Sequence, residues 1–241
     1  MTMKKILYSL FLFCGLTLFV SCEGITSEDP SKVTQFADLE LEGEALITWP
    51  LNTTFVDPGY SAFEGDIDLK DKVVVNGSVN SAKGGKYTLF YSVKNSDGYS
   101  ASVSRTVYVY DPSSPIVSGT YSSTISMNNT NSGATTVRGP FSITLFPIGD
   151  GKCWIEDLLG GWYYIGSGYG AAYAGFGEIK IADDNTLSII KTVNLPWGAP
   201  CIFFDESTYD PDTQTFLLKS RMADVSYMLF TVTLSNPVPF N

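Results

Sequence analysis

The chain has 241 residues, carries a net charge of −10 at pH 7 and contains no histidine. The absence of histidine excludes Ser-His-Asp triads, Cys-His pairs and every histidine-containing metal site. An acidic surface repels phosphate backbones and anionic lipid head groups, so we expect no nucleic-acid partner and no membrane binding by charge. The composition therefore favours a neutral ligand over a polyanion, and any catalysis would have to rest on carboxylates, Lys, Tyr or Ser. We predict no catalytic residue, no cofactor and no metal.

The N-terminal 22 residues have the pattern of a bacterial lipoprotein signal. Lys4 and Lys5 precede an apolar run over residues 6–20, and the small residue Ser21 precedes Cys22. The run is too short for a membrane span, but a charged start, an apolar middle and a small residue before the cut are typical of secretory signals. We predict cleavage before Cys22 and lipid on its thiol. An ordinary signal peptide or an anchor helix is the alternative.

Cleavage would remove two lysines and no acidic residue, which moves the net charge from −10 to −12. It would also leave Cys153 and Cys201 as the two cysteines of the folded part. Exported proteins often contain disulfides, so these two residues form either a disulfide or a pair of buried small apolar side chains. Their spacing alone does not decide between the two readings.

Polar and proline-rich stretches divide the chain. One acidic stretch follows Cys22, and two prolines with two serines interrupt the β-pattern at residues 111–115. The predicted segments are a signal peptide over residues 1–21, an acidic tether over 22–38, a first domain over 39–111, a linker over 112–118 and a C-terminal domain over 119–241.

The first domain shows strong two-residue alternation. Tyr87, Leu89, Tyr91 and Val93 fall on one face of a strand. Glycine pairs and Asp-Gly or Asn-Gly steps supply turn signals on either side. About seven short strands without a helical period predict a small β-sandwich.

Five blocks of this domain carry a family resemblance. They lie at residues 55–62, 73–79, 85–91, 95–99 and 105–109. In order and spacing they resemble the bacterial immunoglobulin-like domain of Bacteroidetes surface proteins and some insecticidal crystal toxins. The resemblance implies a spacer or adhesion unit without catalytic residues. The signal, the tether and this domain together resemble the surface lipoproteins that Bacteroidetes encode beside polysaccharide-uptake systems, and the C-terminal domain is similar to theirs only in general character. This implies a surface-exposed, lipid-anchored outer-membrane protein whose partner is an outer-membrane uptake complex.

The C-terminal domain also reads as strands joined by short turns. The predicted strands are residues 121–127, 141–146, 153–158, 162–165, 176–181, 187–193, 202–204, 216–220 and 225–234. Such a series favours an antiparallel meander, closed as a barrel or folded as a sandwich. The sequence thus predicts an all-β chain, an immunoglobulin-like β-sandwich followed by a second antiparallel barrel or sandwich domain.

A glycine- and aromatic-rich segment over residues 160–176 is the candidate binding site. Sugar rings stack on flat aromatic faces, and glycine lets such faces stay uncovered. We therefore expect Trp162, Tyr164, Tyr169 and Trp197 to bind a neutral glycan. The alternative is that the glycines bend strands and the aromatic residues fill the core.

Acidic residues offer two further hypotheses. Glu64, Asp66, Asp68 and Asp71 lack the spacing of a calcium-binding loop, so a solvated acidic loop is favoured over a calcium site. In the C-terminal domain, Asp157 with Asp205 or Glu206 is the best pair for glycoside hydrolysis.

The predicted function is a non-enzymatic surface protein that binds a neutral oligosaccharide. A structural or adhesion lipoprotein that binds another protein is the main alternative, and a carboxylate-dependent hydrolase is a weaker one.

Overall fold

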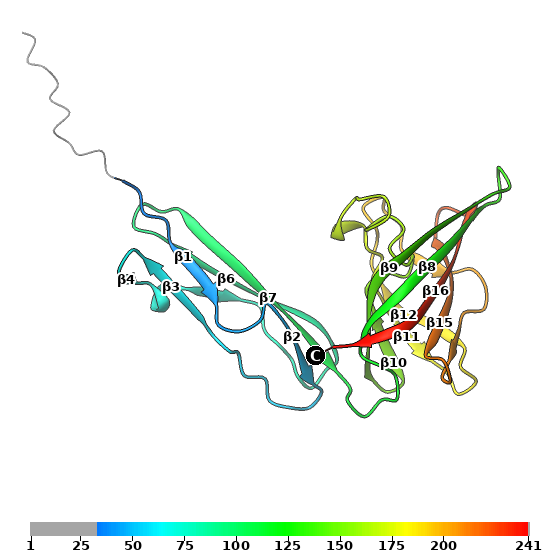
Figure 1. The fold of residues 1–241 in the computed structure, drawn as a ribbon, viewed down its shortest axis with the longest axis horizontal. Coiled ribbons are helices and arrows are strands. Elements are labelled where there is room, and N and C mark those ends of the chain that lie inside the picture. The colour runs from blue at the N-terminus through cyan, green and yellow to red at the C-terminus, as the bar shows by residue number, and fades with distance from the viewer. Residues whose placement is uncertain (1–32, 241) are drawn as a thin grey trace, which may run out of the picture. The chain divides into compact units, whose positions relative to one another are not determined.

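The computed structural model describes residues 33–240, and the chain from Ala37 onward forms one compact unit. Its regular structure is almost entirely β-strand, with two short 3₁₀ turns, η2 (Lys70–Lys72) and η3 (Ala171–Tyr173), so the all-β prediction is confirmed (Figure 1). Within the described residues, no helix has the length and apolar character needed to cross a membrane.

The first domain packs two sheets against each other. One is antiparallel, in the order β1 (Asp38–Leu41), β3 (Tyr60–Glu64) and β4 (Ile67–Asp68). The other has the order β2 (Leu46–Pro50), β7 (Ser100–Tyr110), β6 (Gly85–Lys94) and β5 (Val74–Asn76), and β2 pairs with β7 in parallel. The alternation predicted around Tyr87 is β6, whose inward residues Leu89, Tyr91 and Val93 are buried in the core.

Arg105 is the polar centre of this domain. Its side chain on β7 is fully buried, and its guanidinium forms an ion pair with Asp57. It also donates to the carbonyl oxygens of Glu44 and Gly59, each at 3.2 Å. Tyr91 donates its hydroxyl to the second oxygen of Asp57 at 2.5 Å. This network satisfies the charge that β7 buries, as a buried ion requires.

The second domain is one sheet of nine strands that curls into a near-closed antiparallel barrel (Figure 1). The strands are β8 (Gly119–Asn129), β9 (Ala134–Gly149), β10 (Lys152–Ile155), β11 (Gly177–Ile181), β12 (Leu187–Thr192), β13 (Cys201–Phe203), β14 (Thr208–Asp210), β15 (Thr215–Met222) and β16 (Met228–Pro239). Their order is β12-β11-β10-β9-β8-β16-β15-β13, and β14 also pairs with β15.

The barrel closes where β12 begins. The backbone N–H of Leu187 donates to Ser207 at 2.8 Å, and the N–H of Tyr209 donates to Asn185 at 2.9 Å. These bonds join the first strand of the sheet to the loop before β14, and they leave few strand edges open. Of the two architectures left open by the sequence, the barrel is therefore correct.

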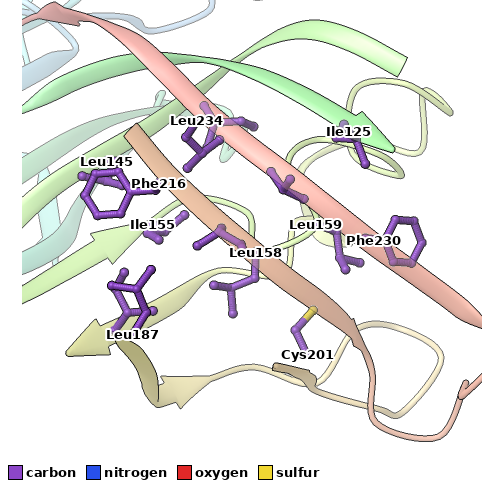
Figure 2. Close-up of a cluster of buried hydrophobic side chains, with 14 of the residues drawn as sticks. Ile125, Leu145, Ile155, Leu158, Leu159, Leu187, Cys201, Phe216, Phe230 and Leu234 are labelled. Atoms are coloured by element: carbon purple, nitrogen blue, oxygen red, sulfur yellow. The ribbon is translucent and has the colours of Figure 1, made fainter. Parts of the chain in front are cut away.

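Inward-facing apolar side chains fill the barrel. Figure 2 shows Leu158 and Leu159, which come from the segment after β10, among Phe216, Phe230 and Leu234 of β15 and β16. All five are buried, so the segment after β10 contributes to the core as well as to the surface.

The sequence left two readings of Cys153 and Cys201 open, and in the structure both residues are buried free thiols without a disulfide. Cys153 lies on β10 and Cys201 on β13, so β11 and β12 separate them along the barrel wall. Burial raises the pKa of both thiols. They pack as small apolar residues, the alternative reading of the sequence.

The strand predicted at residues 162–165 is wrong. After β10 the chain leaves the sheet and makes a run of turns, in which the N–H groups of Ile165 and Gly166 both donate to Gly161. Gly160 and Gly161 adopt φ values of +67° and +95°, which a strand does not use. The glycines therefore end the strand pattern instead of bending it.

Candidate functional site

The site is built on the segment that joins β10 to β11, residues 157–176, which we call the glycine-rich segment. Asp157 opens it and is fully buried. Its carboxylate accepts the backbone N–H groups of Leu159 and Gly161 at 2.9 Å and of Gly175 at 3.0 Å. One side chain thus ties both ends of the segment together.

Burial also sets the protonation of this side chain. Burial raises the pKa of Asp157 to about 6, against the opposite effect of the three backbone donors. Asp157 therefore has a structural role, because both of its carboxylate oxygens accept hydrogen bonds from backbone N–H groups.

Gly160 fixes the segment to the barrel wall. A Cβ at this position would lie 2.6 Å from both Ser123 Oγ and Val232 Cγ1. Ser123 on β8 donates its hydroxyl to the Gly160 carbonyl oxygen at 2.8 Å. The close approach and the left-handed φ both require glycine, so the segment has one docked position.

Four aromatic side chains gather beyond this anchor, and we call Tyr163, Tyr169, Tyr173 and Trp197 the aromatic cluster. The Trp197 ring lies 4.7 Å from Tyr163, 4.8 Å from Tyr173 and 6.1 Å from Tyr169, as measured between ring centroids. The Trp197 plane makes angles of 57–67° with these three rings. Such edge-to-face contacts stabilise aromatic groups without covering all their faces.

The cluster opens to solvent. Tyr169 is 54% exposed and Trp197 is 45% exposed. With Tyr173 they line a hollow of about 400 Å³, and no charged residue lines it. The hollow therefore presents aromatic faces and tyrosine hydroxyls to a ligand, a surface suited to an uncharged molecule.

Trp162 does not belong to this surface, which corrects the sequence prediction. Its side chain is 4% exposed and meets Phe230 of the core at 5.4 Å. The Arg138 guanidinium carbon lies 4.0 Å from the centre of its ring. A ligand cannot stack on Trp162, because its side chain is buried by protein atoms.

The other predicted residues divide between two places. Tyr169 and Trp197 come together in the aromatic cluster, whereas the half-buried Tyr164 lines a different cleft. The sequence reasoning missed Tyr163 and Tyr173. Tyr163 is partly buried and packs against the barrel core, where its ring centroid lies 6.1 Å from that of Phe230 and 4.7 Å from that of Trp197.

The three candidate catalytic carboxylates are not arranged as a pair. Asp157 is buried and bound to backbone N–H groups, whereas Asp205 and Glu206 are exposed. Asp205 forms an ion pair with Lys219 at 2.8 Å, and this contact is the first cause that lowers the Asp205 pKa. Glycoside hydrolysis needs two carboxylates that face one substrate, and these residues do not provide them.

No group of three or more metal-ligating side chains occurs among residues 33–240. In the acidic loop of the first domain, Glu64 instead accepts the N–H and hydroxyl of Ser96 at 2.8 and 2.5 Å. Asp68 accepts the N–H of Lys70 at 2.7 Å. These oxygens organise the local turns.

Among known proteins, the first domain matches the family described as the bacterial surface protein Ig-like domain over residues 39–109. This confirms the immunoglobulin-like resemblance. Residues 110–236 match a second family, which is described as a C-terminal domain. No curated protein matches the chain.

Three solved structures were compared. A chain of Clostridium perfringens ZmpB, solved with its CBM51-2 domain bound to GlcNAc, is 15% identical over 84% of this chain and 44% of that one, with a TM-score of 0.26. A Bacteroides ovatus protein of unknown function is 9% identical over 63% of this chain and 55% of that one, with a TM-score of 0.31. Both likenesses are too weak to indicate a function.

The third is a crystal structure of the lipoprotein BT2262 from Bacteroides thetaiotaomicron. It is 31% identical over 83% of this chain and 100% of that chain, with a TM-score of 0.64. Together with the surface domain, this relative supports a cell-surface lipoprotein. The chain belongs to the family of bacterial surface lipoproteins that includes BT2262.

Proposed function

We propose that this lipoprotein is a non-enzymatic binding protein that takes a neutral oligosaccharide at the aromatic cluster. The observation that carries the proposal is the open hollow formed by Tyr169, Tyr173 and Trp197, which no charged residue lines. Sugar rings present apolar C–H faces to aromatic rings and hydroxyls to polar tips, and this surface offers both. The net charge of −10 further favours an uncharged ligand.

The angles between the rings indicate how much of a glycan the site holds. Tyr163 and Tyr169 lie within 14° of parallel, but Trp197 stands at 65° and 67° to them. Coplanar rings would support several consecutive sugar units, whereas rings that meet at a steep angle form a corner. We expect the corner to hold one sugar unit, at a chain end.

The test is a glycan array with the full-length protein in a detergent that has no sugar head group, followed by calorimetry on the best neutral glycan. Trp197→Ala should weaken binding at least ten-fold, because truncating a central aromatic contact typically costs more than about 1.4 kcal/mol. Phe90→Ala is the matched control, because Phe90 is an exposed aromatic residue on β6 of the first domain and is 56% exposed. It should leave binding unchanged.

Chain length provides a second readout. If the corner holds one terminal unit, then disaccharides and hexasaccharides of the same sugar should bind equally well per chain. Absence of any neutral glycan ligand, or equal binding by wild type and Trp197→Ala, would contradict the site. It would favour the protein-binding alternative, for which exposed tyrosine and tryptophan serve equally well.

The proposal includes a location: the outer membrane, with the protein displayed outward through lipid on Cys22 and close to an uptake complex. Cys22 lies outside the described residues, and the support is the signal pattern and the lipoprotein relative. Intact-mass analysis of the membrane fraction should show a chain that starts at Cys22 and carries lipid, and Cys22→Ala should release the protein from membranes. An unmodified Cys22 would contradict this part of the proposal without affecting the binding site.

A further inference from the structure

We infer a second binding site, independent of the aromatic cluster, for an oligosaccharide that carries a single carboxylate. It lies in a cleft of about 500 Å³ between the turn before β6 in the first domain and strands β10 to β12 of the barrel. This volume is in the range of small-ligand sites, which often form where domains meet. The cleft combines an aromatic wall with amino groups.

Two stacked rings form the wall. Trp154 on β10 and Phe176 lie 6.2 Å apart with 20° between their planes. An ammonium group lies over each ring, Lys86 Nζ at 5.9 Å from the Trp154 centroid and Lys191 Nζ at 5.9 Å from the Phe176 centroid. The half-buried side chain of Tyr164 also lines the cleft. The wall can receive the apolar face of a sugar ring beside positive charge.

The charges of the cleft are unequally paired. Lys191 binds Glu178 at 3.3 Å, and Glu156 accepts the backbone N–H of Thr144 at 2.9 Å. Lys83 and Lys86 have no carboxylate partner among residues 33–240. Two lysines without a carboxylate partner therefore line a single cleft of a strongly acidic protein, and the ammonium group of Lys86 lies over Trp154. They attract one carboxylate, whereas the acidic surroundings repel a long polyanion.

The cleft fits a sugar better than a peptide. Trp154 is the register partner of Glu178, which in turn is the partner of Lys191. The three side chains thus stand in a row across the face of the sheet, and β10 and β11 already have strands on both sides. A peptide that binds as an added strand needs a free sheet edge, so recognition on this face depends on side chains.

A close contact holds the two walls together. A Cβ on Gly84 would lie 2.6 Å from Cα of Ile148 on β9, so the turn before β6 packs directly on the barrel. In the same interface, the ring of Tyr108 on β7 packs against that of Phe146, with 4.9 Å between the ring centroids. The cleft is therefore formed before a ligand arrives.

Cellobiouronic acid and cellobiose test the inference, because they differ by one carboxylate. Calorimetry on the full-length protein, in a detergent without a sugar head group, should show that the acid binds at least ten-fold more tightly than cellobiose. In the double variant Lys83→Gln and Lys86→Gln, the ratio of the affinity for the acid to the affinity for cellobiose should fall to within two-fold of one. Raising the ionic strength should reduce the ratio in the wild type.

The matched control is Lys72→Gln with Lys94→Gln, which removes two exposed lysine charges from the same domain but outside the cleft. It should keep the ratio, as should Trp197→Ala, which tests the aromatic cluster separately. The inference is overturned by a wild-type ratio near one, by a ratio that survives in the cleft variant, or by an equal loss in the control. Binding of a glutamate-containing tetrapeptide as tight as that of the acid would also overturn it.

Discussion

Arg105 and Asp157 are fully buried ionisable side chains, and each organises one domain. Arg105 connects β7 to the chain before β3 through Asp57 and two backbone carbonyl oxygens. Asp157 connects the two ends of the glycine-rich segment through three backbone N–H groups. The partners of Asp157 are buried backbone groups, whereas the partner Asp57 of Arg105 keeps 30% of its side chain exposed. Removing either side chain leaves polar groups without their hydrogen-bond partner.

Arg105→Ala should lower the free energy of unfolding by about 1.5–3 kcal/mol, because it leaves the partly exposed Asp57 and the carbonyl oxygens without their donor. Urea denaturation measures the loss. Lys70→Ala is the control, because the Lys70–Glu42 pair is 3.3 Å long and both side chains are 51% exposed. That change should cost less than about 1 kcal/mol. Equal effects of the two variants would show that the network around Arg105 contributes little.

The buried carboxyl group of Asp157 should give the free energy of unfolding an unusual pH dependence. Burial raises its pKa from 3.8 in the unfolded chain to about 6 in the folded protein. The folded state therefore binds the proton more tightly, so this group stabilises folding below pH 3.8 and loses that contribution as the pH rises through about 6. The difference in unfolding free energy between wild type and Asp157→Asn should fall over this window. A difference that is flat or rises with pH would contradict the assignment.

At the scale of elements, the glycine-rich segment determines where the aromatic side chains point. It leaves the sheet after β10 at Asp157 and docks at Gly160. Beyond this point Tyr163 packs partly buried against the barrel core, whereas Tyr169 is exposed. Leu158 and Leu159 of the same segment enter the core. The position of the aromatic cluster therefore depends on the packing of the barrel beneath it.

Gly160→Ala should destabilise the protein by more than about 2 kcal/mol, because its Cβ would overlap Ser123 and Val232 in addition to the strain of a left-handed φ. Gly168→Ala is matched, since Gly168 has φ +69° and nothing within 4 Å of a Cβ. Gly168→Ala should lower the free energy of unfolding by about 1 kcal/mol, because it adds only the strain of a left-handed φ. Urea unfolding of both variants tests the difference, and equal losses would show that the docking of Gly160 is loose.

Strand β6 and the glycine-rich segment show which features the sequence could predict and which it could not. The two-residue alternation of β6 is a local property, so the sequence predicts that Leu89, Tyr91 and Val93 share one face of a strand, and this face lies in the core. The aromatic residues of the segment are also visible in the sequence, which predicts Tyr169 and, outside the segment, Trp197 as parts of a binding site. Which faces stay open depends on contacts from distant strands, such as Arg138 on Trp162, and these have no local signal.

At the scale of the whole molecule, an aromatic contact joins the two domains. Tyr108 of β7 is 5% exposed, and its ring lies 4.9 Å from Phe146, 5.8 Å from Trp154 and 5.6 Å from Phe240. The backbone N–H of Asp111 also donates to Pro147 at 2.9 Å. The stretch at residues 111–115 is therefore bound to the barrel, and the first domain is expected to unfold together with it.

Tyr108→Ala tests this coupling. It removes the central ring of the contact but none of the residues that fill the separate cores of the two domains. Wild-type protein should unfold in one calorimetric transition, because each domain is stabilised by its contact with the other. The variant should lose about 3–5 kcal/mol and unfold in two transitions. Phe90→Ala, at an exposed site on the same domain, should keep a single transition. One transition in Tyr108→Ala would mean that the remaining contacts are enough to couple the domains, and the cleft between them would then not depend on this ring.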